Sequence, residues 1–248
     1  MEPVFRSLEI AGKTAMRVTG TRLDFRGLEH LPRRGGAVVA INHTSYVDFL
    51  PAALAATACH RRMRFMIKAE MRDVRGVNFL ITHAGTIPVD RSAGGEAYPV
   101  AVDRLRAGEL VGVYPEATIS RSFELKEFKT GAARMALEAQ VPIVPLIVWG
   151  VHRVWTKDHP KSLGRNHIPV TVALGPALTA HGGVDRTMTD LRQAMESLLH
   201  HVQEDYPHPA DAYWVPRRLG GGAPSPEEAT RLDEAERARR GRKQLGRH

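Results

Sequence analysis

The chain has 248 residues, of which 43% are hydrophobic, so it can bury a substantial core. Its one cysteine, Cys59, excludes an intrachain disulfide and suits a reducing compartment. The N-terminus has no apolar run before a small-residue cleavage site, and no uncharged apolar stretch reaches about 18 residues. We therefore expect neither a signal peptide nor a membrane-spanning helix.

The net charge of +8 favours anionic partners such as nucleic acid, acidic lipid or phosphorylated substrates. Residues 217–248 contain nine Arg or Lys and five Asp or Glu, so they supply +4 of this charge and the remainder is only modestly basic. Residues 220–226 are rich in glycine and proline, which is typical of a linker. We therefore expect residues 216–248 to form a flexible basic C-terminal tail.

Apolar side chains in residues 4–18 recur on one helical face, which predicts an amphipathic helix that either packs on the body or contacts a membrane. Beyond it, strands alternate with helices of about ten residues, as in α/β folds. We expect one α/β domain with a mixed, largely buried β-sheet flanked by helices. Its divisions would be 1–28 for the N-terminal helix and first strand, 29–215 for the main domain and 216–248 for the tail. The predicted strands are 22–28, 37–41, 64–67, 86–89, 110–114, 143–148 and 168–174, and the later helices are 45–59, 77–83, 96–107, 130–140 and 186–206.

The first buried strand is followed by a histidine and an aspartate, His43 and Asp48, that are separated by four residues. This spacing alone is weak, because His200 and Asp205 share it inside a predicted helix, where a five-residue offset points side chains to different faces. The first pair differs in context, because it lies at a strand-to-helix junction, where α/β folds place their sites.

In this position Asp48 could accept a hydrogen bond from one imidazole nitrogen of His43 and leave the other free as a general base. Histidine suits that role because its ordinary pKa of about 6.5 lies close to cellular pH. A second interpretation is a helix-capping box formed by Ser45 and Asp48, with His43 as a turn residue. The two interpretations are compatible, because a capped helix start would also hold Asp48 in place.

Three further segments follow in order: residues 85–91 (GTIPVDR), 114–120 (YPEATIS) and 141–146 (VPIVPL). With residues 42–48, they resemble the glycerolipid acyltransferase family of the 1-acylglycerol-3-phosphate acyltransferase type. That family shows N-H-x4-D, then G-x-I-x-x-x-R, F-P-E-G-T-R-S and V-P-I-x-P. The resemblance covers residues 37–150 and implies an O-acyltransferase of phospholipid biosynthesis.

The resemblance implies a role for each matching residue. His43 would be the general base and Asp48 would orient it. Arg91 would bind the acceptor phosphate through paired hydrogen bonds, although a surface ion pair is its alternative. Glu116 would orient an arginine or accept a hydrogen bond from a glycerol hydroxyl.

The chain departs from the third motif, because Ala117 and Ile119 stand where the family has glycine and arginine. Arg121 lies two residues further on and could replace the missing arginine as a phosphate ligand. Other candidate phosphate ligands are Thr118, Ser120, Lys68 and Lys129, whose alternatives are local backbone bonding for the hydroxyls and solvation for the lysines.

The expected reaction is direct transfer from acyl-CoA or acyl carrier protein, without a metal, a bound cofactor or a protein nucleophile. The acceptor would be lysophosphatidic acid or glycerol 3-phosphate, with another lysophospholipid or a glycolipid as the alternative. The candidate acyl-chain pocket residues, each of which could equally be ordinary core, are Phe49, Leu50, Leu54, Val144 and Leu146.

We expect the enzyme to associate peripherally with an anionic membrane surface on the cytoplasmic face. The high pI also raises a non-catalytic nucleic-acid binder as an alternative. That class is disfavoured, because no binding motif is recognisable and the charge is concentrated in the tail.

Overall fold

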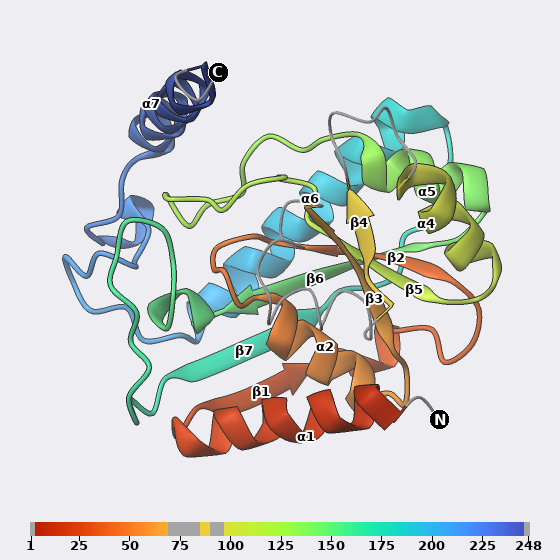
Figure 1. The fold of residues 1–248 in the computed structure, drawn as a ribbon, viewed down its shortest axis with the longest axis horizontal. Helices are drawn as coiled ribbons and strands as arrows, with labels where there is room; N and C mark the ends of the chain where they lie inside the picture. Colours follow the sequence, from red (N-terminus) through yellow and green to blue (C-terminus); the bar gives the residue numbers. More distant parts are fainter. Residues whose placement is uncertain (1–2, 69–84, 90–96, 246–248) are drawn as a thin grey trace.

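The computed structural model describes residues 3–68, 85–89 and 97–245, and it contains one seven-stranded sheet in the order β1-β7-β6-β2-β5-β3-β4 (Figure 1). Neighbouring strands are parallel, except that β6 and β7 are antiparallel. The predicted α/β class with a mixed sheet is therefore confirmed. The strands are β1 (Arg22–Arg26), β2 (Ala37–Ile41), β3 (Met63–Lys68), β4 (Ile87–Val89), β5 (Leu110–Val113), β6 (Ile143–Trp149) and β7 (Pro169–Leu174).

Helices cover both faces of the sheet (Figure 1). In β2 all five side chains are buried, and successive ones point to opposite faces. Val38 and Ala40 pack toward α4, α5 and α6, whereas Val39 and Ile41 pack toward α2. Burial on both faces explains why this strand is an uninterrupted apolar run. The α-helices are α1 (Pro3–Val18), α2 (Phe49–Ala58), α4 (Ala97–Arg106), α5 (Gly131–Ala139), α6 (Gly183–Glu204) and α7 (Pro226–Leu245), and the short 3-10 helices are η1 (Leu28–His30), η3 (Val151–Arg153) and η4 (Arg217–Leu219).

The N-terminal helix α1 lies against α2. A β-carbon at Gly12 would stand only 2.7 Å from Cδ1 of Leu50, so glycine permits the close approach. Ile10 and Val18 of α1 remain 57% and 68% exposed. Among the residues that the structure describes, no helix is long and apolar enough to cross a membrane.

One helix prediction differs from the structure, and another is not tested by it. Helix α2 begins at Phe49 and not at residue 45, because residues 43–48 form a loop whose backbone N–H groups bond to side chains. The helix predicted at 77–83 lies outside the described residues.

The interpretation of residues 220–226 as a linker is wrong. Ala223 is fully buried, and the Gly221 backbone packs so closely on Val215 that a β-carbon would clash. Glycine is used here for close packing and not for flexibility. The predicted flexible tail is instead this packed segment followed by helix α7, which Figure 1 shows at the edge of the molecule.

Candidate active site

The candidate site lies at the carboxyl end of β2, between the ends of its neighbours β5 and β6. Asn42 ends the strand with its side chain: Oδ1 accepts a hydrogen bond from the Val148 N–H at 2.7 Å, and Nδ2 donates to the Val148 carbonyl at 3.1 Å. The side-chain amide thus continues the pairing with β6 while the backbone turns into the next loop. Asn42 belongs to the first sequence motif, but no role was predicted for it.

The structure brings His43 and Asp48 together. His43 Nδ1 lies 3.1 Å from Asp48 Oδ2, and the same oxygen accepts the backbone N–H groups of Thr44 at 2.9 Å and Ser45 at 2.8 Å. Burial raises the pKa of the Asp48 carboxyl, and these donors oppose that rise. No described residue hydrogen-bonds the other ring nitrogen of His43, Nε2, and the side chain is 20% exposed. One imidazole nitrogen is therefore held and the other is available.

The predicted capping box is formed only in part. Asp48 accepts the Ser45 N–H as the motif requires, but Ser45 Oγ accepts the N–H of Val47 at 3.1 Å instead of that of Asp48. Ser45 Oγ also donates to the Trp155 carbonyl at 2.6 Å. The serine consequently anchors the loop to residues that follow β6, and Asp48 is the N-cap of α2.

Tyr114 is a residue of the site that the sequence analysis did not single out. Its ring stacks on the imidazole of His43, with centroids 4.2 Å apart and planes inclined by 25°. The stack and the bond to Asp48 together fix the plane of the imidazole. Its position directly after a buried strand was the available signal, because side chains that follow neighbouring parallel strands meet at one edge of the sheet.

Glu116 organises the backbone around His43. Its Oε1 accepts the His43 N–H at 2.8 Å, and its Oε2 accepts the Lys126 N–H at 3.0 Å. The Ser120 N–H donates to the His43 carbonyl at 2.8 Å, so both backbone polar groups of His43 are bonded. Glu116 is 4% exposed, and burial raises the pKa of its carboxyl to about 8. In this geometry Glu116 positions the histidine loop, and within the described residues its two oxygens accept backbone N–H groups and not an arginine.

The departures from the third motif have structural consequences. Ala117 has a φ of +61°, the left-handed region in which glycine is unstrained, which explains why glycine suits this position. Ile119 is 4% exposed and packs inside, where the family's arginine would carry a charge. The loop therefore keeps the left-handed backbone conformation that glycine favours, although alanine occupies the position.

Arg121, the predicted replacement for the missing arginine, is bonded to carboxylates in the structure. Each of its three guanidinium nitrogens donates to one of them, Asp158, Asp233 or Glu236, so it does not stand free beside His43. The Ser120 hydroxyl is also engaged, because it donates to the Glu124 carbonyl at 2.7 Å. This is the local backbone bonding given as its alternative.

The remaining phosphate candidates are distributed around the loops. Thr118 Oγ1 accepts a hydrogen bond from Lys126 Nζ at 2.7 Å, and Lys129 is exposed. Lys68 ends β3, where its backbone pairs with Val89. Arg91 lies outside the described residues, as does any contact of the Lys68 side chain.

The candidate acyl-chain residues divide into two groups. Val144 and Leu146 are fully buried in the core layer between the sheet and α2, so the prediction that they line a pocket is not supported and they are core residues here. Leu54 is 4% exposed and Leu50 is partly exposed, and both face α1 at Gly12. Phe49 is 39% exposed and remains available to a ligand.

Within residues 3–68, 85–89 and 97–245, no three His, Cys, Asp or Glu side chains are grouped so that they could hold a metal ion.

Residues 22–149, more than half of the chain, match the family model described as Acyltransferase, so the protein belongs to the Acyltransferase family. Among curated relatives, the 1-acyl-sn-glycerol-3-phosphate acyltransferase alpha of Mus musculus is 27% identical over 192 residues, 75% of this chain and 66% of that protein. The human protein of the same name is 32% identical over 133 residues, 52% of this chain and 46% of that protein. The 1-acyl-sn-glycerol-3-phosphate acyltransferase of Bacillus subtilis is 28% identical over 123 residues, 49% of this chain and 60% of that protein.

The chain thus spans about half to two thirds of the length of these relatives. The crystal structure of the 1-acyl-sn-glycerophosphate (LPA) acyltransferase from Thermotoga maritima superposes with a TM-score of 0.69 at 21% identity. The match covers 83% of this chain and 82% of that one, so the two share a fold.

Proposed function

We propose that this protein transfers an acyl chain from acyl-CoA or acyl carrier protein to a hydroxyl of lysophosphatidic acid or glycerol 3-phosphate. The observation that carries the proposal is the His43–Asp48 pair, with Nδ1 of the ring held at 3.1 Å and Nε2 free of described partners. Membership of the Acyltransferase family and the names of the relatives support the same reaction.

In the proposed mechanism, Nε2 of His43 removes the proton from the acceptor hydroxyl as its oxygen attacks the thioester carbonyl. A tetrahedral oxyanion forms, and backbone N–H groups at the start of α2 would stabilise it. The C–S bond then breaks, and the departing sulfur receives the proton from the imidazolium. Asp48 stabilises the imidazolium during both proton transfers and keeps the ring in the tautomer that leaves Nε2 unprotonated at the start.

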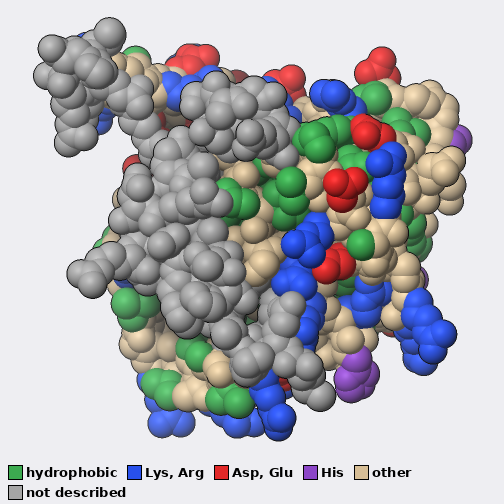
Figure 2. Space-filling model, turned by 45° about the vertical axis from the view of Figure 1, so that its right-hand side comes forward, with side chains coloured by type: hydrophobic (Ala, Val, Ile, Leu, Met, Phe, Trp, Pro, Cys, Tyr) green, Lys and Arg blue, Asp and Glu red, His purple; other side chains and the backbone are tan. Residues whose placement is uncertain are grey.

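Acceptor recognition is proposed for Arg91, whose guanidinium would form paired hydrogen bonds with the phosphate. The catalytic route uses only protein side chains and the two substrates, so we propose that it needs no metal or bound cofactor. We further propose peripheral attachment to the cytoplasmic face of a membrane. The exposed Ile10 and Val18 of α1 and the net charge of +8 suit an anionic lipid surface, and Lys and Arg side chains stand out on the face drawn in Figure 2.

The test is acyl transfer by the purified protein from radiolabelled acyl-CoA to a panel of acceptors. Lysophosphatidic acid and glycerol 3-phosphate would be compared with other lysophospholipids and a glycolipid. His43→Ala should retain the fold, by circular dichroism, and lose nearly all transfer. His200→Ala is the matched control, because His200 is exposed on α6 and has the same five-residue offset from an aspartate. Wild-type turnover by His43→Ala would refute the mechanism, and transfer confined to phosphate-free acceptors would refute the acceptor class.

A further inference from the structure

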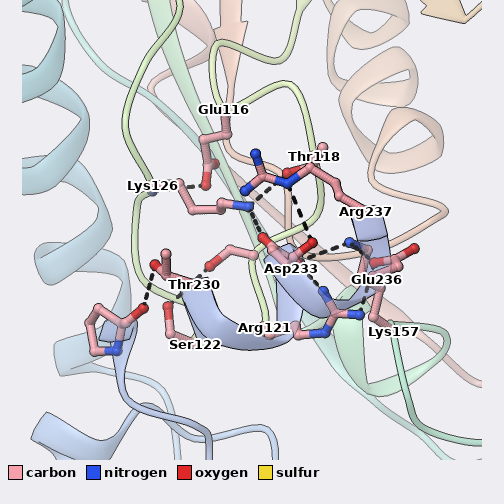
Figure 3. A network of polar contacts seen from close by, with 12 residues as sticks. Glu116, Thr118, Arg121, Ser122, Lys126, Lys157, Thr230, Asp233, Glu236 and Arg237 are labelled. Carbon is pink, nitrogen blue, oxygen red and sulfur yellow. Dashed lines mark hydrogen bonds and ion pairs between the residues drawn. The ribbon is translucent and has the colours of Figure 1, made fainter. Parts of the chain in front are cut away.

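Helix α7 places two carboxylates on a group of three cations that we call the basic cluster: Arg121, Lys126 and Lys157 (Figure 3). Asp233 contacts all three cations, with Lys157 Nζ at 3.3 Å from its Oδ1. Glu236 Oε2 accepts from Arg121 Nη2 at 2.9 Å and from Lys157 Nζ at 3.0 Å. Asp233 and Glu236 therefore each bridge cations that belong to the body of the protein.

The centre of the contact is shielded from water, whereas Lys126 and Glu236 at its rim are 25% and 26% exposed. The side chains of Arg121, Asp233 and Lys157 are 7%, 9% and 11% exposed. Burial alone would raise the pKa of the Asp233 carboxyl, but the hydrogen bond from Lys126 and the cationic charges lower it overall. Buried charges are costly unless they are paired, so the basic cluster requires anions.

Outside α7, the described residues do not supply enough of them. Asp158 pairs with Arg121 Nε at 2.5 Å, and among the described residues it is the other carboxylate that forms an ion pair with a side chain of the cluster. Without α7, three cations would face one carboxylate, which leaves an excess of two positive charges. Asp233 and Glu236 together contribute two negative charges and neutralise the cluster.

Apolar packing contributes little to the attachment of α7. Among residues 226–239, Ala229 is the only apolar side chain that is buried, and Leu232 is 45% exposed. The preceding segment is held independently, because Ala223 is fully buried and Arg218 pairs with Glu124 at 2.7 Å. The helix could therefore leave the cluster while its connection to the body stays packed.

The basic cluster is joined to the candidate active site by direct bonds. Lys126 Nζ donates to Thr118 Oγ1 at 2.7 Å, and the Lys126 N–H donates to Glu116, whose other oxygen accepts from His43. Arg121 directly follows Ser120, whose N–H donates to the His43 carbonyl. An anion bound at the cluster would thus contact Lys126 and Arg121. Lys126 bonds to Glu116 and Arg121 follows Ser120, and these two partners hold the backbone of His43.

We propose that the basic cluster is a binding site for a phosphate monoester, and that Asp233 and Glu236 of α7 occupy this site when no phosphate monoester is bound. A phosphate monoester carries about −1.5 to −2 charges and three strong acceptor oxygens, which matches the charge and the acceptors that α7 provides. The planar guanidinium of Arg121 suits two of those oxygens, and the lysines act as point charges. This binding is separate from acyl transfer and does not require the proposed function to be correct.

The first test is the binding of inorganic phosphate, measured by isothermal titration calorimetry on the full chain without an acyl donor. Asp233→Asn keeps the shape of the side chain but removes its charge, so the variant should bind phosphate at least about tenfold more tightly than the wild type, because charge-assisted hydrogen bonds become available to the ligand. Glu234→Gln is the matched control, because it removes the same charge from the next, exposed residue of α7 and should leave affinity unchanged. Adding Lys157→Gln to Asp233→Asn should abolish the gain.

If Asp233→Asn does not fold, Glu236→Gln provides the same comparison at a side chain that is 26% exposed. Equal phosphate affinity in the wild type and a folded cluster variant would overturn the proposal, as would an equal gain in Glu234→Gln.

Vesicle flotation then separates the two sources of a phosphate monoester. Phosphatidylcholine vesicles with and without phosphatidic acid are compared, with inorganic phosphate as competitor. If Asp233→Asn binds phosphatidic acid vesicles more strongly and inorganic phosphate abolishes this gain, the site accepts soluble and lipid monoesters alike. Enhanced binding that resists phosphate assigns it to the lipid headgroup. A calorimetric gain without enhanced binding to phosphatidic acid assigns the site to soluble monoesters. Repeating the assays in His43→Ala keeps this outcome independent of catalysis.

Discussion

Replacing Asp48 by asparagine separates the charge of this residue from its structural role. The asparagine oxygen can still accept the N–H groups of Thr44 and Ser45, which lie 2.9 and 2.8 Å from the present acceptor. The loop should therefore keep its shape. Asp48→Ala, in contrast, leaves both of these buried donors without a partner, at a cost of about 1–3 kcal/mol each in the free energy of unfolding.

The catalytic loss expected for Asp48→Asn follows from the 3.1 Å separation of His43 Nδ1 and Asp48 Oδ2. At that distance and an effective dielectric constant of about 20, opposite unit charges attract by about 5 kcal/mol. Because about 1.4 kcal/mol changes a rate tenfold, the full interaction would correspond to roughly 10⁴-fold in turnover. The imidazole is 20% exposed and water screens part of this charge, so we expect a loss of roughly 10²- to 10⁴-fold.

The assay measures kcat for acyl transfer alongside urea unfolding of the wild type, Asp48→Asn and Asp48→Ala. We expect Asp48→Asn to unfold near the wild-type midpoint with its turnover reduced as calculated. Turnover within about tenfold of the wild type would show that the carboxylate charge does not stabilise the imidazolium, and the proposed role of Asp48 would fail.

Three further predictions concern neighbouring positions. Glu116→Gln removes a carboxyl whose pKa is raised by burial from 4.5 to about 8. Between these pH values unfolding releases the proton of Glu116, so the stability of the wild type should fall with rising pH relative to that of the variant. Urea titrations should show a fall of at most about 1.4 kcal/mol per pH unit. A parallel pH dependence in the two proteins would contradict this. Arg91→Ala should mainly raise the acceptor KM, with partial rescue by lysine; a change confined to the donor KM would place Arg91 on the other substrate. Ala117→Gly should raise the free energy of unfolding by about 1 kcal/mol or less, because it relieves a φ of +61° but adds entropy to the unfolded chain; lower stability on thermal unfolding would argue against strain there.

The strands of the sheet could be predicted from the sequence because the central ones are buried on both faces. Strands buried on both faces, such as β2 and β6, are short apolar runs between polar loops, and such runs are visible without the fold. The pairing of His43 with Asp48 was equally accessible, because both residues lie in one loop.

Helix α7 was missed because its apolar pattern is weak and its contacts are ionic. A local signal for its start did exist. Ser225 and Glu228 form a reciprocal capping box, in which the Ser225 N–H donates to Glu228 at 2.8 Å and the Glu228 N–H donates to Ser225 Oγ at 3.2 Å, with Pro226 at the first helical position. The glycines just before it favoured the interpretation as a linker. The engagement of Arg121 had no local signal, since Asp233 is 112 residues away in sequence.

The side chain of Asn42 makes the position of His43, the proposed general base, depend on the alignment of two strands. An amide offers a donor and an acceptor side by side, which is what the N–H and carbonyl of Val148 require. An aspartate would set a carboxylate against the carbonyl, and leucine would satisfy neither group. Because His43 is the next residue, a slip of β2 along β6 by one position would break both bonds and carry the imidazole away from Tyr114 and Glu116. The register of β2 on β6, and not the loop alone, thus fixes where the imidazole of His43 lies.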